Sequence, residues 1–112
     1  MENQGIREIL NRIAVKDTTF QEKANWRQTN QAWLDRSAKI AIAVLSTLRK
    51  NRAEGKSPAN QKELAERLGI SPQQVNKIVK GQENLTLETV SRLEQALEIR
   101  LIDVPQEVLS LD

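Results

Sequence analysis

The segment from Gly69 to Gly81 constrains the fold more than any other part of the chain, because it contains the start and stop signals of one short helix. Ser71 is suited to the N-cap and Pro72 to the first helical position, and Gln74 completes a Ser-x-x-Gln capping box. Gly81 then ends the helix, since glycine readily adopts the left-handed backbone that follows a helix. The pattern predicts a helix of about nine residues.

This helix has one apolar side and one polar side. Ile70 and Val75 can form a hydrophobic staple across the cap, and Val75, Ile78 and Val79 fall on the side expected to be buried. The side left for solvent or a partner carries Gln73, Gln74, Asn76, Lys77 and Lys80.

A second short helix is expected directly before it. Asn60 can cap this helix with Glu63 as its third residue, and Leu64, Ala65 and Leu68 supply an apolar stripe before Gly69. Two short helices separated by a glycine-containing turn, here Gly69-Ile70-Ser71, form a helix-turn-helix unit.

The rest of the chain also shows helical patterns. In the N-terminal part, we expect an amphipathic helix over Ile6, Ile9, Leu10 and Ile13, and a second helix that is capped by Thr19 with Glu22 and leads towards Trp26 and Trp33. A longer helix is expected over about Arg36 to Arg52, with Ala41, Val44, Leu45 and Leu48 on one face. A further helix is expected after the cap Thr86; Leu85 and Val90 form its hydrophobic staple, and Leu93, Ala96 and Leu97 face inward. The branched residues of Ile99 to Val104 could instead form a short strand. The predicted fold class is all-α, a bundle of about five to seven helices.

The domain boundaries follow from these patterns. We expect an N-terminal helical extension over residues 1–35, a helix-turn-helix domain over residues 36–104 and a C-terminal tail over residues 105–112. The only linker-like composition is Asn51 to Asn60, where Gly55, Ser57 and Pro58 disfavour helix.

The charges are unevenly distributed along the chain. Residues 1–35 are neutral, residues 36–80 carry ten basic against three acidic side chains, and residues 81–112 carry two basic against seven acidic ones. The net charges are therefore 0, +7 and −5, which sum to the overall +2. A basic middle segment predicts a local surface for a polyanion.

Composition excludes several classes of function. The chain has no cysteine and no histidine, so disulfides, the usual zinc sites and histidine acid–base catalysis are excluded. No glycine-rich loop or nucleophile pair is present, and we expect neither an enzyme nor a cofactor. The absence of a hydrophobic signal region and of a membrane-spanning apolar run leads us to expect a cytoplasmic protein.

Three stretches of the chain together carry a family resemblance: Gln61 to Ser71, Val75-Asn76-Lys77-Ile78-Val79-Lys80-Gly81, and Leu85 to Val90. They closely resemble the lambda-repressor-like, Cro/repressor-type helix-turn-helix family. The resemblance covers about Lys39 to Leu101. It implies binding of double-stranded DNA as a homodimer, with the second helix of the motif in the major groove.

Position in the motif then suggests the contact residues, because long amide and cationic side chains can reach base edges or phosphates. The expected base contacts are Gln73, Gln74, Asn76 and Lys77, and the expected phosphate contacts are Gln61, Ser71, Lys80, Gln82 and Asn84. Pro72 departs from the family pattern, in which a base-reading polar residue often stands at this position. Recognition of the DNA bases should therefore shift to Gln73 and Lys77, or become less stringent.

The function predicted from these features is a sequence-specific transcriptional repressor that acts as a dimer on a pseudo-palindromic operator. One alternative is an antitoxin that represses its own operon and binds a small toxin through the N-terminal extension or the C-terminal segment. Another is a protein-interaction module without an operator. Trp26 and Trp33, seven residues apart, are expected to fill an intramolecular core in preference to forming a partner-binding hot spot.

Overall fold

The protein is described by a computed structural model over residues 19–105. The chain divides between Ala32 and Trp33 into two compact units. In the first unit residues 19–29 are helical, so Thr19 lies inside the helix and not at its N-cap. Trp26 is 53% exposed, which corrects the expectation that it fills a core. The helix predicted over Ile6 to Ile13 lies outside the described residues.

Helix α2 spans Gln31–Glu54 and is longer at both ends than the predicted helix over Arg36 to Arg52. No glycine or proline interrupts this stretch, and Gly55 follows it with a φ of 70°. Its buried side chains are Ser37, Ile40, Ala41, Val44 and Leu48. Leu45, predicted to face inward, is 42% exposed, because the next residue after buried Val44 is rotated by about 100° around the helix.

The linker-like stretch after α2 is tied to the helices on both sides. The Asn51 side-chain amide donates to the Pro58 carbonyl at 2.9 Å, and the Lys56 backbone N–H donates to the Asn51 carbonyl at 2.7 Å. On the other side, the Ala59 backbone N–H donates to Glu63 Oε1 at 3.1 Å. Pro58 itself is buried. This short connection therefore fixes the entry into the next helix.

The two helices of the motif are α3, Gln61–Leu68, and α4, Pro72–Val79. Asn60 Oδ1 accepts from the Glu63 N–H at 2.8 Å, which confirms the predicted cap of α3. Gly69 ends α3 with a φ of 70°, and its own N–H and that of Ile70 return to the last turn. The predicted turn and the position of α4 are confirmed.

Helix α5 spans Leu87–Leu97, and Thr86 caps it by accepting from the Thr89 N–H at 3.1 Å. Residues 99–105 do not form the strand considered for Ile99 to Val104. The N–H groups of Leu101 and Ile102 instead donate to the Glu94 carboxylate, at 2.7 and 3.2 Å. Because no strand occurs within residues 19–105, these branched residues have no ladder to join there.

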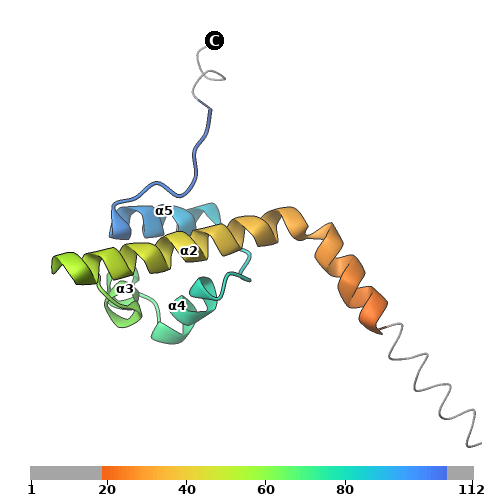
Figure 1. The fold of residues 1–112 in the computed structure, drawn as a ribbon, viewed down its shortest axis with the longest axis horizontal. Helices are drawn as coiled ribbons and strands as arrows, with labels where there is room; N and C mark the ends of the chain where they lie inside the picture. Colours follow the sequence, from red (N-terminus) through yellow and green to blue (C-terminus); the bar gives the residue numbers. More distant parts are fainter. Residues whose placement is uncertain (1–18, 106–112) are drawn as a thin grey trace, which may run out of the picture. The chain divides into compact units, whose positions relative to one another are not determined.

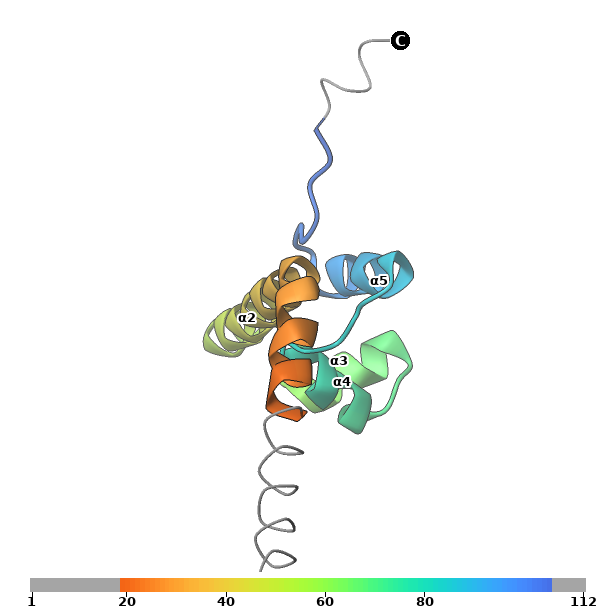
Figure 2. The same ribbon diagram turned by 90° about the vertical axis from the view of Figure 1, so that its right-hand side faces the viewer.

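One apolar core joins the four helices of the second unit. Helix α3 packs against α4 and α5, and α2 contributes Ile40, Val44 and Leu48. Leu64, Val75 and Leu93 have no exposed surface. Figures 1 and 2 both place α4 at one end of this unit and residues 99–105 at the other. The all-α prediction is confirmed, and no helix in the described part of the chain is long and apolar enough to cross a membrane.

Candidate nucleic-acid interface

Helix α4 presents a polar stripe on the side opposite its core contacts. Val75 and Ile78 are buried, whereas Gln73, Lys77 and Lys80 are exposed and follow one another at spacings of four and three residues. Side chains three and four apart share one face of a helix. The structure thus groups these three residues on a single outward stripe, which can present one amide and two cations to a partner.

Asn76 lies beside this stripe and connects it to α3. Its side-chain amide donates to Gln61 Oε1 at 3.4 Å. Gln61 is the first residue of α3, directly after the Asn60 cap. Two predicted contact residues from different helices are therefore adjacent, at a helix N-terminus where the backbone dipole favours an anion.

Ser71 holds the start of α4 and keeps its hydroxyl accessible. Its Oγ accepts from the Gln74 N–H at 3.1 Å, which confirms the predicted cap. A hydroxyl that accepts one hydrogen bond retains a proton to donate. Because Ser71 is exposed, that proton can be offered to a phosphate oxygen while the cap remains in place.

Gln74 is set apart from the outward stripe. It lines a cavity of about 220 Å³ together with Ile78 of its own helix and with Asn84, Thr89 and Arg92. The structure therefore brings Gln74 and Asn84 to the flank of α4 that faces the start of α5. A contact by these two residues would differ in direction from one made by Gln73 or Lys77.

Arg92 is a candidate that the sequence analysis missed. It lies on α5, pairs with Glu88 at 2.9 Å, and lines the same cavity as Gln74. Arg92 and Arg100 are the only basic residues between Gly81 and Asp112, and an isolated cation in an acidic segment was the available signal. Its position beside α4 depends on the packing of α5, which helical spacing does not give.

The residues after α4 form a close turn against α2. Lys80 is the C-cap of α4, and Gly81 follows with a φ of 77°. A Cβ at Gly81 would lie 3.0 Å from the Ala38 Cα. Because Gly81 lies this close to α2, the position of the next residue, the exposed Gln82, is fixed relative to the core.

The charge of the middle segment is carried entirely at the surface. All ten basic side chains between Arg36 and Lys80 are exposed. Among them, Lys56 pairs with Glu54 at 3.1 Å, and Arg52 and Arg67 donate to the Ala59 and Ala96 carbonyls. Helix α4 carries no acidic residue. Its outward stripe is therefore positive, as a surface for phosphates requires.

Other site chemistries find no support in this part of the chain. Within residues 19–105 no cluster of three or more carboxylates could hold a metal ion. Glu94, a carboxyl whose pKa is lowered, is bound to the backbone of residues 101 and 102 and lies away from the α4 stripe in sequence. The geometry is that of a binding surface.

Comparison with known families agrees with this geometry. Residues 60–104 match a family model described as helix-turn-helix, which confirms the resemblance seen in the sequence. Residues 38–80 match one described as winged helix-turn-helix DNA-binding, although no strand that could form a wing occurs within residues 19–105. No curated protein and no solved structure matches the chain. The capped α3–α4 pair and these two matches, which lie within residues 38–104, support a DNA-binding transcription regulator with a helix-turn-helix domain.

Proposed function

We propose that the protein is a sequence-specific repressor that binds a pseudo-palindromic operator as a dimer. The observation that carries this proposal is the outward stripe of Gln73, Lys77 and Lys80 on a helix capped at its N-terminus. An α-helix fits the major groove, and a two-fold dimer places two such helices about 34 Å apart in successive grooves. Occupancy of the operator would exclude RNA polymerase.

The residues divide into two roles. Glutamine and asparagine can bind adenine through two hydrogen bonds, and lysine can bind guanine. We assign base contacts to Gln73, Asn76 and Lys77, with Gln74 reaching the flank of the site. We assign phosphate contacts to Gln61, Ser71, Lys80, Gln82 and Asn84, which occupy helix ends and turns beside the stripe.

The first experiment is selection of bound sequences from a random duplex pool. The selected duplex and a scrambled one are then titrated at several salt concentrations. We expect a palindrome that is bound about a thousandfold more tightly than the scrambled duplex. Weak binding without enrichment that disappears as salt rises would contradict sequence-specific regulation, because counterion release alone would explain it.

Single substitutions separate the two roles. Gln73→Ala should weaken binding to the selected operator by about 1 to 3 kcal/mol and relax one base position, with little effect on random DNA. Lys80→Ala should weaken binding to all duplexes alike and lower the salt slope by about one.

Arg100→Ala is the matched control for the lost charge. Arg100 is exposed and pairs with Asp103 at 3.4 Å, within the segment that lies opposite α4 in both ribbon views. This variant should bind like the wild type. If Gln73→Ala and Lys80→Ala reduce specific and random binding equally, the assignment of roles is wrong.

A further inference from the structure

An apolar groove lies beside the helix-turn-helix; of the proposed DNA contacts only Asn84 lines it, and none on α4 does. It has a volume of about 210 Å³ and is formed by the start of α2, the connection from α4 to α5, the start of α5 and the C-terminal segment. Its apolar lining consists of Trp33, Ile40, Leu85, Leu87, Val90 and Ile102. A groove of this kind on a small domain buries apolar surface only when something occupies it.

Large apolar side chains gather at the edge of this groove. Leu87, the first residue of α5, is 74% exposed. Ile102 is exposed on another wall, and Val104, two residues further on, is exposed as well. Nothing in the fold requires Leu87 to be apolar, because the core contacts of α5 come from Val90, Leu93 and Leu97.

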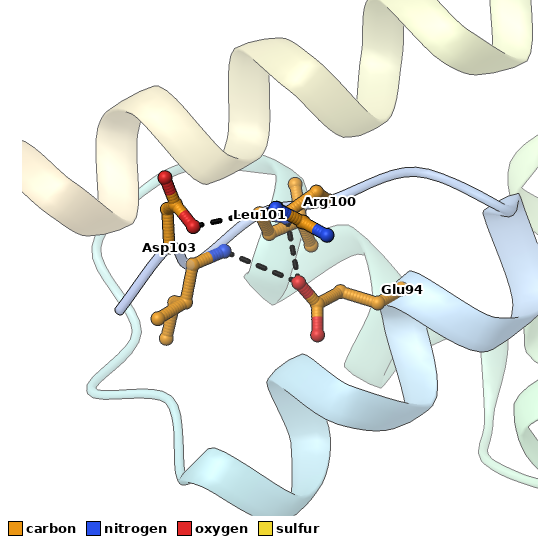
Figure 3. Close-up of polar contacts among 5 residues, drawn as sticks. Glu94, Arg100, Leu101 and Asp103 are labelled. Atoms are coloured by element: carbon orange, nitrogen blue, oxygen red, sulfur yellow. Dashed lines mark hydrogen bonds and ion pairs between the residues drawn. The ribbon is translucent and has the colours of Figure 1, made fainter. Parts of the chain in front are cut away.

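The wall that carries Ile102 is held in place by hydrogen bonds. Figure 3 shows Glu94 of α5 accepting from the Leu101 and Ile102 backbone N–H groups, at 2.7 and 3.2 Å. Arg100 and Asp103, whose side chains are both 75% exposed, also pair at 3.4 Å, but neither lines the groove and this surface pair adds little to its stability. The groove therefore exists before any partner binds, which lowers the entropic cost of association.

The charges around the groove are self-complementary. Arg36 and Lys39 line it from α2, whereas Glu83 lines it from the α4–α5 connection. In a two-fold contact the same patch occurs on both partners, so the basic side of one copy can face the acidic side of the other.

We propose that this groove is the dimer interface, with Leu87 of each copy seated in the groove of a second copy of the chain. The proposal rests on the proposed dimeric repressor and specifies which surface forms the dimer. It leaves the outward stripe of α4 free for DNA, because none of its three residues lines the groove.

The test is sedimentation equilibrium of the full chain and of Leu87→Glu. An acidic residue suits the first turn of a helix, and Leu87 is already exposed, so this variant should keep the wild-type unfolding midpoint. We expect its dimer dissociation constant to rise about a hundredfold or more, since both copies lose an apolar anchor. On a duplex with a single half-site, the variant should bind like the wild type.

Ile42→Glu is the matched control, because Ile42 is 64% exposed on α2 and does not line the groove. It should leave the dimer intact. A dimer that survives Leu87→Glu, or one that Ile42→Glu disrupts, would overturn the proposed interface while operator binding by the wild type still supports the repressor. A wild type that is monomeric both free and on its selected DNA would overturn the dimer itself. A monomer that instead binds a small apolar carboxylate or a different protein at Leu87 would assign the groove to that occupant.

Discussion

Gly69 and Gly81 both adopt left-handed backbone, at φ of 70° and 77°, but their surroundings differ. A Cβ at Gly69 would meet nothing within 4 Å, whereas one at Gly81 would approach the Ala38 Cα to 3.0 Å. Gly69→Ala should lower the free energy of unfolding by about 1 to 2 kcal/mol, the cost of the left-handed conformation alone. Gly81→Ala should lower it further, since α2 backbone must move.

Urea unfolding of both variants measures this difference. Gly55→Ala is a second control, because Gly55 has a φ of 70° and open space around it. If the three variants lose equal free energies of unfolding, the contact between Gly81 and Ala38 does not contribute to the difference between the glycines.

Individual side chains also show where sequence reasoning was sufficient. The caps at Asn60, Ser71 and Thr86 were predicted because the residues that make them are three apart in the chain. The position of Arg92 beside α4, and that of Gln74 facing the start of α5, depend on how α5 packs. Local patterns do not contain that information.

At the scale of elements, the attachment of the C-terminal segment to α5 depends on the ionisation of Glu94. The backbone N–H of Leu101, followed by that of Ile102, holds the pKa of the Glu94 carboxyl below its ordinary value of 4.5. Desolvation opposes this effect, and the charge of Arg100 adds to it. A lowered pKa in the folded state means that the carboxylate stabilises this attachment fully above pH 4.5.

The attachment should therefore be lost as pH falls from about 4.5 through the lowered pKa of Glu94. The loss of attachment is measured by amide hydrogen exchange at Leu101 and Ile102, after correction for the intrinsic pH dependence of exchange. Protection should fall over this range in the wild type. In Glu94→Gln, protection should be weaker at neutral pH and independent of pH. A wild-type profile without a transition would contradict the role of the carboxylate.

The helices themselves were largely predictable, and the exceptions have physical reasons. Helices α3, α4 and α5 lie between strong start and stop residues, so their bounds follow from the sequence. Helix α2 lacks such signals at its start and extends to Gln31. The segment 99–105 has strand-like composition, but its donors bind a carboxylate on the preceding helix.

At the scale of the whole molecule, a dimer on a palindrome should show a salt dependence that a single subunit does not. Each neutralised phosphate contributes about −0.9 to the slope of log K against log salt, so two subunits should give a slope about twice that of one. The measurement compares the wild type on the full operator with Leu87→Glu on a single half-site. Equal slopes would indicate that only one subunit contacts DNA.

The packing of α3 against the next two helices in the chain also bears on how quickly this unit forms. Helix α3 packs against α4 and α5, both within a few tens of residues, and the connections between these helices are short. Chains whose contacts are local close small loops and reach the native state within microseconds to milliseconds. A freshly synthesised copy of the chain would therefore complete this core almost as soon as α5 has left the ribosome.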